Sequence, residues 1–193
     1  MSSTDPSSRA TDLETLDRLA ALLHDLCSRS DREDGWSQWR DATGAYRLLV
    51  PSWSRLEAAA GAEGVGFFGE LRPTSGDEFP PHLEPAVADG AAGAGWLLAY
   101  FNARFTDLTS EGAPRYGNLV IVTEHTATSS LLHDASHVDA VERACSAYRS
   151  VRIHRLTLSG PPARQPTIAV RETLSLDYDT VSPSRIVATG NAM

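Results

Sequence analysis

The sequence predicts an α+β fold in which helices pack against an antiparallel sheet. The order of elements in its second half is strand, strand, helix, strand, strand, and a helix and a strand precede them. The chain has 193 residues, 41% of them hydrophobic and 22% charged, which is average usage for a globular protein. No stretch approaches the roughly 20 apolar residues of a membrane span. We therefore expect one domain over 11–180.

The first predicted element is a helix over 12–29. Thr11 and Glu14 form a capping box, and leucines then recur at helical spacing. These leucines are Leu13, Leu16, Leu19, Leu23 and Leu26. Residues 1–10 are rich in serine and are expected to be a flexible lead.

The rest of the N-terminal part, 11–62, is expected to be short and mixed. Trp36 and Trp39 suggest an irregular or helical piece, and a strand over 46–50 ends at Pro51. Ser54 and Glu57 form a second capping box, which predicts a short helix that ends at Gly61.

The barrel part, 63–180, begins with a strand and a long loop. The strand is predicted over 65–72. Prolines and glycines without periodicity follow over 73–95, which is typical of a lid or a binding loop. The remaining strands are predicted over 96–107, 118–126, 151–159 and 167–178, with a helix over 131–148. The tail, 181–193, is expected to be loose.

Charge and residue usage exclude several classes of function. The 25 acidic and 17 basic residues give a net charge of -8, which disfavours nucleic acid and anionic membranes as partners. All 17 basic residues are arginine, so a lysine Schiff base and a P-loop lysine are excluded. The first residues have no apolar secretory segment, so a cytoplasmic location is expected. Cys27 and Cys145 stand among apolar residues and are interpreted as core side chains.

The second half resembles the dimeric α+β barrel superfamily, a ferredoxin-like group that includes antibiotic-biosynthesis monooxygenases and polyketide cyclases. The resemblance covers 96–178. It depends on the hairpin WLLAYFNARFTD…GNLVIVTEHT, the helix LLHDASHVDAVERACSAYRS and the strand VRIHRLTLSG. It implies a small-molecule site, but the superfamily contains cofactor-free oxygenases, cyclases, haem enzymes and plain ligand binders.

Two strands carry polar residues where chemistry could occur. In the last strand, Glu172 interrupts an apolar face, so it is a buried general acid or base, a strand-edge residue that pairs with an arginine, or a residue that a bulge turns outward. In the strand from Trp96, one face changes from apolar to hydrogen-bonding: Trp96, Leu98, Tyr100, Asn102, Arg104. Such a face suits a ligand cavity, or a strand that emerges into solvent.

Histidines are the other candidates. His154 shares a predicted face with Leu156 and Leu158, and His125 shares one with Leu119 and Ile121, so either is a base, a haem ligand or a core histidine. His133 and His137 lie four apart on the predicted helix but away from its apolar face, and no metal site is predicted. No Ser/His/Asp order and none of the motifs GxSxG, GxGxxG and HExxH occurs.

These observations lead to three hypotheses. The first is a cofactor-independent cyclase, isomerase or oxygenase for a small hydrophobic molecule. Its catalytic residues would be Glu172, His154 and Arg104, and its substrate-binding residues Asn102, Tyr100, Trp96, Phe68 and His125. The second is a haem enzyme of the same superfamily. The third is a non-catalytic binding or interaction module whose N-terminal helix docks a partner. A homodimer is expected, since a second copy would cover the exposed side of an open sheet.

Overall fold

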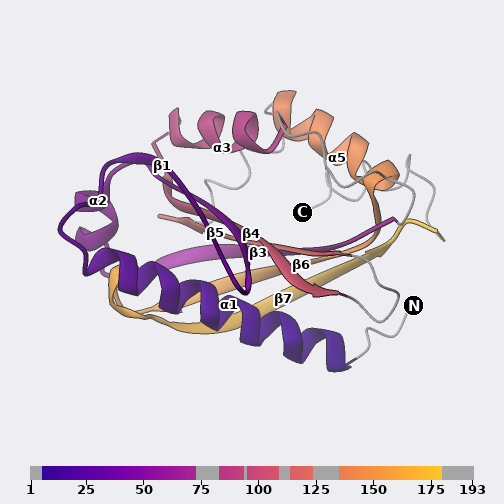
Figure 1. Ribbon diagram of the computed structural model, residues 1–193, viewed down its shortest axis with the longest axis horizontal. Helices are drawn as coiled ribbons and strands as arrows, with labels where there is room; N and C mark the ends of the chain where they lie inside the picture. Colours follow the sequence, from indigo (N-terminus) through magenta and orange to yellow (C-terminus); the bar gives the residue numbers. More distant parts are fainter. Residues whose placement is uncertain (1–5, 73–82, 94, 109–113, 124–134, 180–193) are drawn as a thin grey trace.

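The part of the chain that the structure describes forms a seven-stranded antiparallel sheet with helices on both faces, as Figure 1 shows. The computed structural model describes residues 6–72, 83–93, 95–108, 114–123 and 135–179. The strands are β1 (Gly35–Asp41), β2 (Gly44–Val50), β3 (Ala62–Leu71), β4 (Leu97–Leu108), β5 (Pro114–Val122), β6 (Tyr148–Ser159) and β7 (Thr167–Asp177). The helices are α1 (Pro6–Cys27), α2 (Trp53–Ala58), α3 (Leu83–Gly93), α5 (Ala135–Ala147) and the short 3-10 helix η1 (Pro162–Arg164). The predicted α+β class is confirmed.

The strand order is β1-β2-β4-β5-β3-β6-β7, so β3 lies in the interior of the sheet and β1 and β7 form its two edges. Within it, β3, α3, β4, β5, α5 and β6 follow one another as a β-α-β-β-α-β unit. Both helices of this unit cover the same face of the sheet, and α1 covers the opposite face (Figure 1). The N-terminal part therefore adds a hairpin, β1–β2, to the same sheet.

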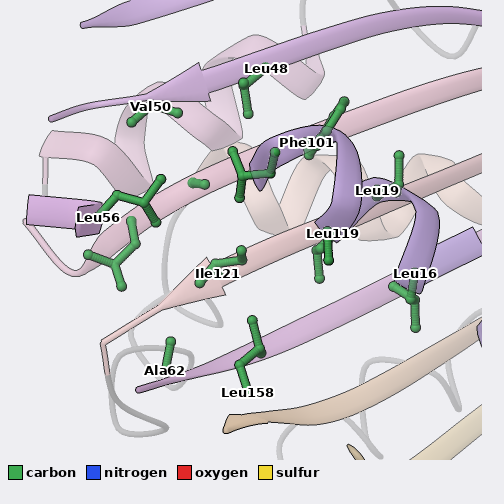
Figure 2. Packing of buried hydrophobic residues seen from close by; sticks show 14 of the residues in the cluster. Leu16, Leu19, Leu48, Val50, Leu56, Ala62, Phe101, Leu119, Ile121 and Leu158 are labelled. Atoms are coloured by element: carbon green, nitrogen blue, oxygen red, sulfur yellow. The ribbon is translucent and has the colours of Figure 1, made fainter. Parts of the chain in front are cut away.

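The face that α1 covers, here called the α1 face, contains the largest apolar core. Leu16, Leu19 and Leu23 of α1 are fully buried, as the helical spacing of the leucines predicts. Figure 2 shows Leu16 and Leu19 next to strand side chains of this cluster. Gly66 of β3 permits this close approach, because a Cβ atom there would lie 2.9 Å from a methyl carbon of Leu16. The strand residues of this core include Leu48, Phe101, Leu119, Ile121, Leu156 and Leu158.

The opposite face, here called the α3/α5 face, has two smaller apolar clusters at its two ends. Ala88 and Ala91 of α3 pack on Leu97 and Val122. Ala144 and Ala147 of α5 pack in a separate cluster, together with Leu71, Tyr148 and Val151. Several side chains on this face of the middle strands are only half-buried: Val65, Phe67, Asn118, Val120 and Ile153. Of these, Val120 packs against the first cluster and Phe67 against the second.

Two predicted segments differ from the structure. Trp36 and Trp39 lie in strand β1, where residues three apart point to opposite faces. Accordingly Trp39 stacks on Tyr46 at a ring distance of 5.3 Å, and Trp36 contacts Tyr100 at 6.2 Å. Within the predicted loop 73–95, residues 83–93 form α3, because small alanines let a helix pack closely on the sheet. Residues 73–82 and 94 lie outside the described residues.

Other boundaries shift by a few residues. Helix α1 begins at Pro6, so residues 6–10 belong to it and not to a flexible lead. In α5, Val138 is 38% exposed, whereas Ala144 and Ala147 are buried. Strand β5 begins at Pro114, four residues before its predicted start. Within the part of the chain that the structure describes, no helix is long and apolar enough to cross a membrane.

Candidate functional site

The sheet divides the sequence-predicted site residues between its two faces. Phe68 and His154 lie on the α1 face, where their rings meet edge to face at 5.6 Å. Tyr100 and Trp96 pack in the cluster of the α3/α5 face instead. A single small ligand cannot contact both groups, because the sheet separates them. His125 falls outside the described residues.

A β-bulge in β4 explains part of this division. Leu97 pairs with Val122 and Ala99 with Ile121, which leaves Leu98 without a register partner. Because an extra residue reverses the alternation of side chains, Leu98 joins the α1 face and Leu97 the α3/α5 face. The expected grouping of Leu98 with Tyr100 on one face is therefore wrong.

The middle of the α3/α5 face carries a compact group of polar side chains. Asn102 of β4 pairs with Arg47 of β2 on one side and with Asn118 of β5 on the other. Tyr100 and Arg104 lie two positions before and after Asn102 on the same strand. Neighbouring strands are about 4.8 Å apart and alternate residues about 6.6 Å, so all four surround Asn102 closely. These five residues (Arg47, Tyr100, Asn102, Arg104, Asn118) are called the Asn102 cluster below.

Asn118 is incompletely hydrogen-bonded within this cluster. Its Nδ2 atom donates to the hydroxyl of Tyr100 at 3.4 Å. Its Oδ1 atom is buried, and no described residue offers it a hydrogen bond. Turning the amide around would move the deficit to the nitrogen without removing it. A buried amide atom without a partner costs about 1–3 kcal/mol, so this position calls for a partner that the described residues do not supply, such as a water molecule or a ligand.

Aromatic and cationic groups surround the cluster. The guanidinium of Arg47 lies 5.1 Å from the ring centre of Trp36, whose Nε1 atom donates to Asp89 of α3 at 2.8 Å. On the β3 side, Phe67 pairs with Asn118, and Tyr116 pairs with Arg104 across β4 and β5. A few hydrogen-bonding groups framed by aromatic rings are typical of small-molecule sites.

Trp96 does not belong to this cluster. It precedes Asn102 by six residues, which along a strand corresponds to about 20 Å. It is half-buried beside α3, and its buried Nε1 atom has no hydrogen-bond partner among the described residues. The predicted substrate-binding role of Trp96 together with Asn102 is therefore not supported by their positions.

Glu172 is also remote, and it is not buried. A bulge between β6 and β7 leaves Arg171 without a register partner and pairs Glu172 with Arg155. The Glu172 side chain is 51% exposed, and its carboxylate lies 3.6 Å from Arg155. Four strand spacings separate it from Tyr100, or about 19 Å. The expectation of an inward-facing carboxylate is wrong, and the alternative of a bulge that turns it outward is right.

His154 belongs to a second polar group, on the α1 face. His154 and Asp12 are both fully buried. The Nε2 atom of His154 lies 3.0 Å from Oδ2 of Asp12, and its Nδ1 atom lies 2.9 Å from the hydroxyl of Thr173. These contacts join α1, β6 and β7. The burial predicted for His154 is confirmed.

Arg152 neutralises the buried Asp12. Its Nε atom donates to Oδ2 at 2.6 Å and its Nη2 atom to Oδ1 at 3.0 Å, a two-pronged pair. Burial alone would raise the pKa of Asp12, but hydrogen bonds from Arg152 and His154 and the nearby positive charge outweigh it and lower that pKa. The guanidinium also lies 3.4 Å from Glu70 of β3. Asp12 is therefore a carboxylate in the folded chain.

Sequence reasoning missed Asp12, Arg152, Thr173 and Asn118. Asp12 and His154 are 142 positions apart, and no short motif could join them. The capping box at Thr11 predicted that the helix starts next to Asp12. The helix begins at Pro6 instead, so Asp12 lies inside it, where it contacts His154. For Asn118, the available signal was a polar residue between apolar ones at the start of a predicted strand.

The structure bears on the haem-ligand alternative for His154 and on metal binding. Because both ring nitrogens of His154 are engaged, it could bind a haem iron only by giving up one of these contacts. No group of three or more His, Cys, Asp or Glu side chains with metal-binding geometry occurs among the described residues. His133 is not among them, and His137 is half-buried on α5.

Comparisons with protein-family models, with curated proteins and with solved structures found no match for this chain.

Proposed function

We propose that this chain binds a small hydrophobic molecule with a negatively charged oxygen, such as a carboxylate, enolate or phenolate, at the Asn102 cluster. The observation that carries this proposal is the Asn118 amide, one of whose two polar atoms is buried without a partner among the described residues. With the amide turned so that Nδ2 holds this position and Oδ1 accepts from the Tyr100 hydroxyl, its N–H group would donate to an anionic oxygen. Asn118 lies in a cluster with two arginines, in a chain whose net charge is -8. A cationic group at the middle of a sheet in an acidic protein favours an anionic ligand.

The chemistry of the cluster fits such a ligand. Arginine and asparagine offer several N–H donors that can converge on one oxyanion, and Trp36 and Phe67 offer aromatic surface beside them. The same donors would stabilise an enolate that forms during a reaction. The enzymatic version of this proposal is a cofactor-independent cyclase, isomerase or oxygenase, with Arg104 and Asn102 as the oxyanion-binding residues.

His154 and Glu172 have no part in this proposal. His154 lies on the opposite face, and Glu172 lies four strand spacings, or about 19 Å, from Tyr100 of the cluster. The third hypothesis, in which the N-terminal helix docks a partner, conflicts with burial, because the apolar side of α1 is already occupied by the sheet.

The fold supports a ferredoxin-like assignment, which is part of the proposal. The strands β4-β5-β3-β6 of the β-α-β-β-α-β unit lie in the order second, third, first, fourth. Read from the other end, this is the split βαβ arrangement of ferredoxin-like proteins. The expected homodimer is retained with it, and the edges available to a second copy would be β1 and β7.

The test is ligand-induced stabilisation against a panel of paired compounds. Benzoate, salicylate and naphthoate would each be compared with the corresponding neutral amide by thermal melting. A ligand present at a hundred times its Kd stabilises the folded chain by about 2.7 kcal/mol. We expect acids to raise the melting temperature and their amides to have little effect.

Two variants and one control test whether the acids bind at the Asn102 cluster. Asn118→Leu and Arg104→Gln are expected to abolish the stabilisation by acids. Arg164→Gln removes an exposed arginine in η1, away from the cluster, and should leave it unchanged. Stabilisation that survives both cluster variants, or a panel in which no acid stabilises the wild type, would contradict the proposal.

A further inference from the structure

Thr173, His154 and Asp12 form a chain of three hydrogen-bonded groups on the α1 face, separate from the Asn102 cluster. The Thr173 hydroxyl lies 2.9 Å from Nδ1 of His154, and Nε2 of His154 lies 3.0 Å from the Asp12 carboxylate. A hydroxyl within reach of an imidazole that is itself oriented by a carboxylate is the arrangement of an activated nucleophile.

The charge state of Asp12 decides which way the protons point. Because Arg152 donates twice to Asp12, its carboxylate is ionised and can only accept hydrogen bonds. In a neutral imidazole, the proton therefore lies on Nε2, which donates to Asp12. Nδ1 then carries the lone pair and accepts from the Thr173 hydroxyl. In this tautomer, Nδ1 of His154 is placed to withdraw the Thr173 proton.

The three hydrogen-bonded groups differ in their exposure to solvent. His154 and Asp12 are fully buried, whereas Thr173 is half-buried and belongs to β7, an edge strand of the sheet. A base that is shielded from water, beside a hydroxyl that is partly exposed, favours a reaction at the hydroxyl.

We propose that Thr173 is a nucleophile that accepts an acyl group from activated esters, with His154 as its general base and Asp12 as the group that orients His154. In the step, Oγ1 of Thr173 adds to the ester carbonyl carbon while its proton passes to Nδ1 of His154. The bond to the leaving oxygen breaks, and the alcohol or phenol departs with that proton. The product is an acyl ester on Thr173.

The test uses the full chain and p-nitrophenyl acetate as the acyl donor. Release of p-nitrophenol gives the rate, and peptide mapping by mass spectrometry locates the acetyl group. We expect one acetyl group, on Thr173. Thr173→Val should lose the labelling, and Thr173→Ser should keep it. Thr167→Val removes an exposed threonine of the same strand and should have no effect.

A second variant tests the role of His154. His154→Gln removes the base, and in a chain shown to be folded by its melting curve the acylation rate should fall about a hundredfold, the usual size of general-base catalysis. Asp12→Asn keeps the size of the side chain and provides the same comparison if His154→Gln does not fold. An unlabelled wild type, labelling that Thr173→Val does not remove, or an unchanged rate in a folded His154→Gln or Asp12→Asn chain would each overturn the proposal.

Discussion

The two faces of the sheet bury their side chains in different ways. On the α1 face, one continuous apolar core extends from Leu23 of α1 to Leu158 of β6. On the α3/α5 face, the apolar contacts form two clusters at the ends, and the middle holds the Asn102 cluster. The comparison teaches that the two sides of the same strands are built differently: one side holds a continuous apolar core, and the other holds the polar group for which we propose a ligand. Adjacent residues of β5 show it most directly, since Leu119 is fully buried and Asn118 is half-buried.

The largest loss in the free energy of unfolding is expected when the buried charge on the α1 face is removed. Asp12→Ala leaves Arg152 and His154 without their shared partner in the interior, which costs about 3–5 kcal/mol. We expect urea unfolding to show a loss of this size.

The control for this prediction is Asp17→Ala, which removes an exposed aspartate of the same helix. It should change the free energy of unfolding by no more than about 0.5 kcal/mol. Equal effects of the two substitutions would show that the Asp12 contacts contribute little to the fold.

Two truncations to alanine in β5 compare how tightly the two faces of the sheet are packed. Leu119→Ala deletes a fully buried side chain of the α1 face and should cost about 2–5 kcal/mol. Val120→Ala deletes a half-buried one of the α3/α5 face and should cost about 1 kcal/mol. Denaturant unfolding of both variants measures the difference. A cost for Val120→Ala as large as that for Leu119→Ala would mean that the α3/α5 face is packed as tightly as the other.

Acid should destabilise the α1 face through Asp12. Because the pKa of Asp12 is held below its ordinary value of 3.8, the unfolded chain takes up this proton at a higher pH than the folded chain does. The stabilisation is therefore complete above the unfolded pKa and is lost as the pH falls through the folded one.

Measuring the free energy of unfolding from about pH 6 down to about pH 2 tests this, with Asp12→Asn as the reference. The wild type should lose more stability than the variant over the acid part of this range. Parallel curves for the two proteins would show that Asp12 does not contribute to the acid response.

The smallest expected change in stability has the opposite sign to the others, because it is a gain and not a loss. Asn118→Leu replaces an amide whose Oδ1 atom is buried without a partner among the described residues by an apolar side chain of similar size. Removing an unsatisfied polar group of this kind is neutral or stabilising, by up to about 1 kcal/mol. Thermal melting without ligand should therefore show an unchanged or raised Tm. A clear loss of stability would indicate that Asn118 serves the fold more than a ligand.

Much of the fold could be predicted from the sequence, and the reasons for the failures are physical. The spacing of the leucines in α1 and the apolar runs of β4 and β6 are strong signals, because long buried elements need regular patterns. Helix α3 was missed because its sequence, LEPAVADGAAG, contains proline, glycine and small residues. Its buried positions are alanines, which pack well but carry little hydrophobic signal.

The candidate sites were less predictable, because they depend on pairing. The bulges in β4 and β7 each shift side chains to the other face, and a single sequence does not show them. Asn102 and Asn118 become neighbours only through the register of β4 and β5. Asp12 finds His154 only after α1 has packed across the sheet. His154 was recognised as an inward-facing residue, whereas its two partners were not.

The interior position of β3 has a consequence for how the chain folds as it is made. Val65 pairs with Val120 on one side and with Arg155 on the other, so its partners follow it by 55 and 90 residues. At a synthesis rate of about 5–20 residues per second, β3 waits roughly 5–20 s for its second partner. Throughout that interval, the hairpin of β1 and β2 can form from local contacts. The apolar strand with Phe67 and Phe68 cannot pair on both sides, which makes this nascent segment one that chaperones would bind.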